Sequence, residues 1–364
     1  MLTDKCRHPY RMFISYSHDD RALADKLEAH LRKCGVIPVR DTSITAGARF
    51  SDEIKRKISF SHVFVALLTR CSKLRPWVHQ ELAYALGLGL PVLPLALDEL
   101  PEGMAHEIQA LRVAPDLCDL PERLTAKSLD DLVATAQDAR RAMFECADKP
   151  YDRTRLLVEY ARNLQRQAGP CRIRQRVAFS SFSLPSRGAK HEDWDVIEGS
   201  NRRDEALREL LRRERAVMEE HAREAGCDLI IDPFVMVRDD PARGKVRLKH
   251  AYGATIRRLE ILEEFVVSMP AGKLNIAIQE GKIDGSTIVV GDWVLAEAVV
   301  PHYKSDYRQT IFTRHAPTVL AKIEEFDRDF ADAACDFSPG EATSNQAAID
   351  TLKRRIEELH QSGG

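Results

Sequence analysis

The sequence has no apolar run long enough to cross a membrane, since a spanning helix needs about 20 consecutive apolar residues. Its longest apolar stretch, residues 86–97, is interrupted by Gly87, Gly89, Pro91 and Pro94. The first residues, MLTDKCRHPY, also lack the apolar segment of a signal peptide. We therefore expect a cytoplasmic protein that has no membrane partner.

The sequence also has little net charge. Its 54 Lys and Arg residues nearly balance its 56 Asp and Glu residues, which leaves a formal charge of −2. Whole-molecule electrostatics therefore favours neither nucleic acid nor an anionic membrane as a partner. Apolar residues make up 44% and charged residues 30%, as in folded domains with an ordinary core, and a length of 364 residues suggests two of them.

The cysteines form no recognisable pairs. None of the eight lies at a spacing typical of metal fingers or redox motifs. We expect them to be reduced and to act mostly as small apolar side chains, and we expect no metal site. They are Cys6, Cys34, Cys71, Cys118, Cys146, Cys171, Cys227 and Cys335.

What the first part of the chain does have is a regular alternation of apolar strands and amphipathic helices. Continuous apolar runs such as residues 62–69 are typical of strands that are buried on both faces. The alternation predicts a parallel sheet with helices on both sides. The expected strands cover residues 11–17, 36–40, 62–69 and 91–97, and the expected helices cover residues 22–34, 50–58, 77–89 and about 128–146.

Four segments in this order resemble the TIR domain family: FISYSHDD, VIPVRDTSITAGARF, ISFSHVFVALLT and CSKLRPWVHQELAYAL. The resemblance covers residues 9–147 and implies a flavodoxin-like fold, in which the second segment holds the mobile BB loop. Family members that cleave NAD+ place a catalytic glutamate four residues after a tryptophan. Those positions here are Trp77 and Glu81, so the resemblance implies that Glu81 is catalytic, that NAD+ is the substrate and that no cofactor is needed.

The chemistry suits a carboxylate. Cleaving the nicotinamide–ribose bond builds positive charge on the ribose, as in glycoside cleavage, and nicotinamide leaves as a neutral molecule without a general acid. Glu81 can bind ribose hydroxyls and face the charged carbon. Trp77 lies one helical turn earlier, on the same side of the helix, where its ring can pack near nicotinamide. On their spacing alone, we would interpret Glu81 as a solvated surface residue and Trp77 as a packing residue. The resemblance to the TIR family favours a functional role for both.

The remaining candidate residues follow two of the expected strands, at the carboxyl ends where open parallel sheets bind ligands. Ser15, Tyr16 and Ser17 can offer hydroxyls and backbone amides to ribose or phosphate, although such a cluster also suits a turn or helix cap. Arg40 can contact phosphate, and Asp41 lies beside it. The alternative is that Arg40 is an exposed rim residue and that Asp41 starts a loop.

The second part of the chain predicts a charged helical connector at residues 148–170, an α/β or α+β domain at 171–335, and a tail at 336–364 that carries a short helix. Strands are expected at 176–182, 227–237 and 308–314, with an antiparallel pair of segments, 273–281 and 286–300, that turns near Asp284 and Gly285. The Arg- and Glu-rich helix at about 203–225 is expected to pack one face and expose the other to solvent.

This second domain resembles catalytically inactive, sensor-like relatives of the phospholipase D superfamily. The active family needs His-x-Lys followed by four residues and Asp. His302 and Lys304 supply the first part, but Gln309 stands where Asp is required. We therefore expect a domain that recognises an unknown ligand or protein partner rather than a phosphodiesterase.

Together, these features predict a NAD+ glycohydrolase of bacterial anti-phage immunity that makes ADP-ribose or cyclic ADP-ribose. Enzymatic TIR domains self-associate, so we expect assembly controlled by the C-terminal domain. Two alternatives stay open at this point: a TIR synthase of a nucleotide messenger and a non-enzymatic signalling adaptor.

Overall fold

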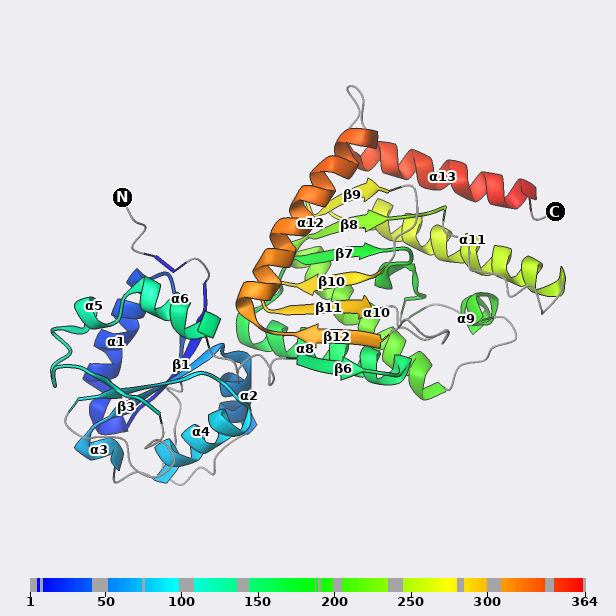
Figure 1. Cartoon of the computed structure of the whole chain (residues 1–364). Helices are drawn as coiled ribbons and strands as arrows, with labels where there is room; N and C mark the ends of the chain where they lie inside the picture. The colour runs from blue at the N-terminus through cyan, green and yellow to red at the C-terminus, as the bar shows by residue number, and fades with distance from the viewer. Residues whose placement is uncertain are drawn as a thin grey trace. The chain divides into compact units, whose positions relative to one another are not determined.

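The structure is a computed structural model of the whole chain (Figure 1). It describes residues 5–6, 9–40, 52–73, 76–97, 108–135, 144–186, 188, 191–198, 205–234, 245–279, 285–299, 309–337 and 344–362. The chain divides into two compact units. The first comprises residues 1–144 and 314–320, and the second comprises residues 145–313 and 321–364. No helix among the described residues is both long enough and apolar enough to span a bilayer.

The first unit is built on a five-stranded parallel sheet with the order β2-β1-β3-β4-β5. The alternating pattern predicted the parallel sheet, and this strand order is that of the flavodoxin-like fold that the resemblance to the TIR family implied. Its strands are β1 (Arg11–Ser15), β2 (Ile37–Val39), β3 (Val63–Leu68), β4 (Val92–Ala96) and the short β5 (Leu111–Arg112). The sequence pattern did not predict β5.

Helices cover both faces of this sheet. They are η1 (His18–Asp20), α1 (Arg21–Lys33), α2 (Asp52–Phe60), α3 (Arg70–Lys73), α4 (Pro76–Gly87), α5 (Leu120–Arg123) and α6 (Ala126–Thr135). On one face, Leu27 of α1 and Leu129 of α6 are fully buried against the strands. On the other face, Ile58 of α2 and Leu82 of α4 fill the second core. Each such side chain contributes about 1.5–3 kcal/mol by leaving water.

The helix expected at 128–146 is wrong at its end. Helix α6 is described to Thr135, and β6 (Phe144–Ala147) is an edge strand of the other sheet, beside β12 (Gln309–Thr313). Pairing with a strand more than 160 residues away in sequence is a tertiary effect, and local helix propensity does not report it.

The second unit contains a seven-stranded mixed sheet with the order β6-β12-β11-β10-β7-β8-β9. Strands β7, β8 and β9 are parallel, whereas β10, β11 and β12 pair antiparallel. The remaining strands are β7 (Ile173–Val177), β8 (Cys227–Ile231), β9 (Leu274–Ile278), β10 (Thr287–Val290) and β11 (Val294–Val299). The mixed sheet agrees with the expected α/β or α+β class.

The expected pairing of residues 273–281 with 286–300 is wrong. Strand β9 is the edge strand opposite β6 and pairs with β8, while the hairpin joins β10 to β11 through a turn at Gly291. Gly291 has a φ of 62°, a conformation that glycine adopts readily. The Gly291–Asp292 pair inside the apolar run at residues 286–300 was therefore the sequence feature that indicated the hairpin turn. Asp284 lies outside the described residues.

Strand β7 also begins earlier than expected. It covers Ile173–Val177, and the last two residues of the strand expected at 176–182, Ser181 and Phe182, belong to the 3-10 turn η3 (Ser181–Ser183). Within β7 the side chains alternate strictly: Ile173, Gln175 and Val177 are buried, while the arginines between them are partly exposed. This alternation gives the strand one core face and one polar face.

The helices of this unit are α8 (Pro150–Ala168), α9 (His191–Glu198), α10 (Glu205–Ala225), α11 (Lys245–Ser268), α12 (Ala316–Phe337) and α13 (Ser344–Ser362). Helix α12 runs across the polar face of the sheet (Figure 1). Its Lys322 pairs with Glu297 of β11, and its Asp327 pairs with Arg174 of β7. Helix α13 is 19 residues long and contacts α11 and β9, so it is longer than the short helix expected there.

Helix α8 packs lengthwise on α10. His221 of α10 is fully buried and hydrogen-bonds the carbonyl of Ala161 on α8 through Nε2 at 3.0 Å. Glu214 of α10 is only 1% exposed and forms an ion pair of 2.5 Å with Arg153 of α8. The Ser181 hydroxyl donates a 2.7 Å hydrogen bond to the same carboxylate. The segment expected to connect the domains is thus packed into the second unit.

Candidate active site of the N-terminal unit

The candidate site lies at the carboxyl end of β1, where the chain leaves the centre of the parallel sheet. Ser15 is the last residue of β1 and is 1% exposed. Helix α4 brings Glu81 to the same point, and that side chain is 4% exposed. The Ser15 hydroxyl donates a hydrogen bond of 2.6 Å to Oε2 of Glu81. Two residues that are 66 positions apart in the sequence therefore meet in a buried pair.

The burial of Glu81 follows from the local sequence. Pro76 begins α4, as proline does at a first helical turn. The helix then packs Val78, Leu82 and Ala85 against the sheet. Glu81 directly precedes Leu82 and lies beside this apolar stripe, so its carboxylate is buried at the edge of the sheet, next to the end of β1. A carboxylate in such a place needs a hydrogen-bond donor, and Ser15 is one.

Three aromatic rings lie next to one another near the Ser15–Glu81 pair. The rings of Tyr16 and His18 are 6.3 Å apart, and those of His18 and Trp77 are 5.5 Å apart, each pair edge to face. Trp77 is partly buried and one helical turn before Glu81. Tyr16 also packs against the core on the α1 side of the sheet. The predicted residues Tyr16 and Trp77 are thus linked through His18, which the sequence analysis did not include.

Ser17 is fully buried and precedes η1. Its carbonyl accepts a 2.8 Å hydrogen bond from the amide of Asp20, whereas its hydroxyl has no hydrogen-bond partner in the described part of the chain. The alternative interpretation of residues 15–17 as a helix cap therefore holds for the backbone carbonyl of Ser17 and not for its side chain. The hydroxyl is enclosed in this structure, and its contact with a ligand stays a prediction.

Arg40 follows β2, and its guanidinium is engaged by the protein itself. It forms ion pairs with Asp25 at 2.5 Å and Glu28 at 2.7 Å, both on α1, and lies 5.9 Å from the ring centre of Tyr16. Burial lowers the pKa of Arg40, but the hydrogen bond and charge of these carboxylates outweigh it and raise the pKa overall. Its role as a phosphate ligand stays a prediction. Asp41, predicted beside it, lies outside the described residues, as do His302 and Lys304.

A second polar pair at the same edge was missed. Asp20 is 7% exposed and accepts a 2.6 Å hydrogen bond from the hydroxyl of Thr69, which directly follows β3. The Thr69 amide in turn donates to the hydroxyl of Ser72 at 2.8 Å. A signal was present, since Thr69 ends an apolar strand run just as Ser15 does.

The fold and the site define an open parallel α/β domain with a buried carboxylate at the carboxyl end of strand β1. Residues 12–130 match the family model described as TIR domain, and this part of the chain is a TIR domain. The match does not extend into the second unit.

Other comparisons add little. No curated protein matches the sequence. One solved structure that matches is that of TrmBL2, titled an archaeal chromatin protein with a novel mode of DNA binding. It is 10% identical with a TM-score of 0.26, and the match covers 57% of this chain and 59% of that chain. A likeness this low carries no argument about the fold or function of this protein.

Proposed function

We propose that the TIR domain hydrolyses NAD+ at the bond between nicotinamide and ribose, with Glu81 as the catalytic carboxylate. The observation that carries this proposal is the burial of Glu81 at the carboxyl edge of the sheet, with the Ser15 hydroxyl donating to Oε2 at 2.6 Å. Membership of residues 12–130 in the TIR family supports the same chemistry.

Glu81 acts by stabilising charge. As nicotinamide departs, the ribose becomes an oxocarbenium-like cation, and a carboxylate held in a site of low dielectric stabilises it more than one in water. Ser15 orients the carboxylate by donating a hydrogen bond to Oε2, and the carboxylate supplies the negative charge that faces the ribose. Water then adds to the ribose and gives ADP-ribose, whereas attack by the adenine ring gives a cyclic product.

Trp77, His18 and Tyr16 form the aromatic side of the proposed site. Planar nicotinamide stacks well on such rings, and the leaving group is neutral, so stacking does not oppose its departure. The unpartnered hydroxyl of Ser17 is the donor or acceptor assigned to ribose. Arg40 and Asp41 remain the predicted contacts on the phosphate side.

The test is nicotinamide release by the full chain, with wild type and Glu81→Gln compared in the presence of a crowding agent that forces clustering. Glutamine still accepts the Ser15 hydrogen bond, so the free energy of unfolding should change by less than about 1.5 kcal/mol. The rate should fall about 100-fold or more, because the negative charge is lost.

Glu53→Gln is the matched control. Glu53 is another helical glutamate of the TIR domain, its side chain is 63% exposed, and it pairs with Lys57 at 3.3 Å. Its substitution should leave the rate unchanged. Wild-type release by Glu81→Gln would refute the catalytic role, and absence of NAD+ loss by clustered wild type would favour an adaptor.

We also propose that the TIR domains self-associate, that the second unit controls this association, and that the assembly acts in immune signalling. Product analysis by chromatography separates hydrolysis to ADP-ribose from synthesis of a cyclic messenger. Sedimentation of the full chain with and without the crowding agent tests whether activity follows assembly.

A further inference from the structure

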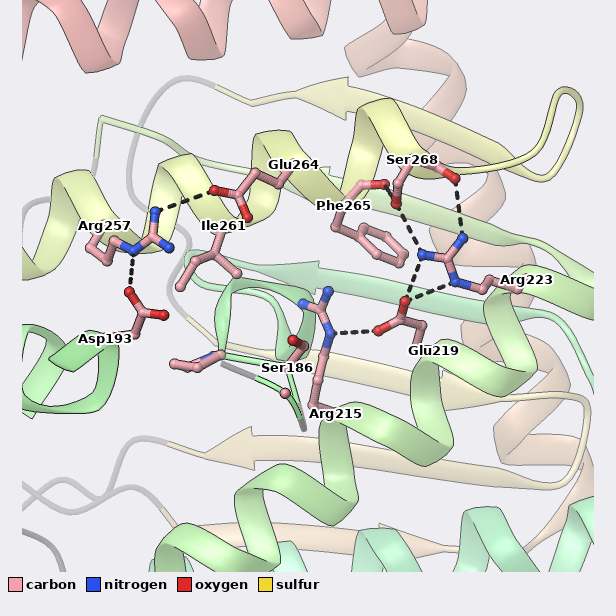
Figure 2. Close-up of a pocket in the computed structure, with 12 residues that line it drawn as sticks. Ser186, Asp193, Arg215, Glu219, Arg223, Arg257, Ile261, Glu264, Phe265 and Ser268 are labelled. Carbon is pink, nitrogen blue, oxygen red and sulfur yellow. Dashed lines mark hydrogen bonds and ion pairs between the residues drawn. The ribbon is translucent and has the colours of Figure 1, made fainter. Parts of the chain in front are cut away.

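The second unit contains a cavity of about 370 Å³ between α10 and α11, which is also lined by Pro185, Ser186 and Gly188 after β7 and by Asp193 of α9 (Figure 2). Its volume lies in the range of small-molecule sites, about 300–1,000 Å³. All its lining residues lie between Pro185 and Ser268, within one unit.

One end of the cavity has an excess of positive charge. Arg215 and Arg223 of α10 both donate to Glu219, through Nε at 3.0 Å and 2.8 Å, so both carboxylate oxygens are occupied. Arg223 also donates to the carbonyl and hydroxyl of Ser268. Two guanidinium groups therefore face one carboxylate, a formal excess of +1.

Arg215 keeps one donor group open. It is 4% exposed, and Nη1 donates to the carbonyls of Phe182 and Leu184. Its guanidinium carbon lies 4.9 Å from the ring centre of Phe265. Nη2 donates to no atom of the described residues, and the side chain projects towards the cavity (Figure 2). Burial lowers the pKa of this guanidinium, and an anion bound at Nη2 would offset that cost.

The other end has an excess of negative charge. Arg257 of α11 pairs with two carboxylates that line the cavity, Asp193 of α9 at 2.8 Å and Glu264 at 3.3 Å, and also with Glu260 outside the lining at 3.0 Å. Each of the two lining carboxylates uses Oδ1 or Oε1 for this contact. Oδ2 of Asp193 and Oε2 of Glu264 are therefore left to accept hydrogen bonds from a ligand. Among the residues that line this end, the formal excess is −1.

Two apolar side chains of α11 line the cavity beside these charges. Ile261 and Phe265 lie between Arg257 and Ser268 on the same face of α11 and are 5% and 2% exposed. Ile261 lies beside Glu264 at the negative end, and Phe265 lies beside Arg215 at the positive end (Figure 2). The cavity thus presents negative charge at one end and positive charge at the other, each next to an apolar side chain.

We propose that this cavity binds a small elongated zwitterion, with an oxyanion on Nη2 of Arg215 and an ammonium group on Asp193 and Glu264. The lining charges sum to zero, so a polyanion such as a nucleotide gains little at one end and is repelled at the other. A molecule with one charge of each sign is attracted at both ends. The proposal concerns the second unit alone and is independent of NAD+ cleavage.

The experiment is isothermal titration calorimetry of the full chain with 6-aminohexanoate, compared with hexanoate and hexylamine, which each carry one of its charges. The zwitterion should bind at least about tenfold more tightly than either single-charge compound, because each of those leaves one end of the cavity unpaired. Equal affinities for all three compounds, or no heat with millimolar 6-aminohexanoate, would overturn the proposal.

Variants locate the binding. Glu264 is 67% exposed, so Glu264→Gln should fold normally and weaken 6-aminohexanoate about tenfold while leaving hexanoate unchanged. Glu263→Gln is the matched control, because Glu263 is the neighbouring residue on α11, does not line the cavity and faces Lys353 at 3.9 Å. If Glu264→Gln binds 6-aminohexanoate as tightly as Glu263→Gln does, the assigned ammonium site is wrong.

Discussion

Replacing Ser15 with alanine should loosen the TIR domain around Glu81. The substitution deletes a hydroxyl that is 1% exposed and that donates to a carboxylate oxygen 2.6 Å away. A hydrogen bond to a charged group contributes about 1.5–3 kcal/mol, and the carboxylate that remains is still buried at 4% exposure. Local stability at the end of β1 and in α4 should fall by that amount.

Hydrogen exchange followed by mass spectrometry measures this directly. Because the chain has two units, a single unfolding midpoint would mix their responses, whereas exchange reports each segment separately. The amides of β1 and α4 should exchange about 10–150-fold faster in Ser15→Ala, since each 1.4 kcal/mol corresponds to a factor of ten. The amides of β7 and β8 in the second unit should be unaffected.

Ser17→Ala is the matched control. Ser17 is also a buried serine, two positions away, but its hydroxyl has no hydrogen-bond partner among the described residues. Deleting an unsatisfied buried hydroxyl should be neutral or slightly stabilising. If both variants exchange alike, the Ser15–Glu81 hydrogen bond contributes nothing, and the orientation assigned to Glu81 loses its support.

Two further predictions concern the backbone and the thiols. Gly291→Ala should destabilise the second unit by about 1–3 kcal/mol, because its φ is 62° and an added Cβ would lie 3.0 Å from a side-chain carbon of Leu164. Gly253→Ala, in α11 with open space around it, should stabilise this unit by about 0.5–1 kcal/mol, and hydrogen exchange of the amides of β10, β11 and α11 compares the two variants. Burial raises the pKa of Cys227 to about 12, so iodoacetamide should not label it at pH 8 before unfolding. The exposed Cys118 should react, slowly at first because a hydrogen bond with Asp116 raises its pKa, and faster as the pH rises; peptide mass spectrometry that finds equal labelling would contradict both statements.

Most of the TIR fold was predictable because its signals are local. The run at residues 62–69 is buried at every position, as a central parallel strand must be, and β3 occupies Val63–Leu68 within it. Pro76 marked the start of α4 correctly. Strand β5 was missed because two residues carry no periodicity.

The second unit was harder because its strands depend on distant partners. The sequence between residues 273 and 300 contains three strands, and its pattern alone does not reveal that β9 and β10 lie apart in the sheet. Placing the turn near Asp284 instead of Gly291 followed from that ambiguity. Strand β6 likewise exists only because β12 is beside it.

The candidate site could be predicted in part. The end of a predicted strand identified Ser15 and the resemblance to the TIR family identified Glu81, but neither predicted the hydrogen bond between them, because it depends on the packing of α4. The charged cavity was not foreseen at all. The Arg- and Glu-rich helix was expected to expose its charges, yet Arg215 is 4% and Glu214 1% exposed. Charged residues are buried when they are paired, and no local pattern reports their partners.

The attachment of α8 to α10 has a mechanical consequence. Separating α8 from α10 would leave the buried Glu214 carboxylate without its partner Arg153, in a place that water does not reach. It would also break the hydrogen bond between His221 and Ala161. Losing one partner of a buried ion pair costs about 3–5 kcal/mol. Helix α8 is therefore unsuited to act as a hinge, because α8 and α10 move together. A movement of either helix is passed on to β6, the strand that α8 follows.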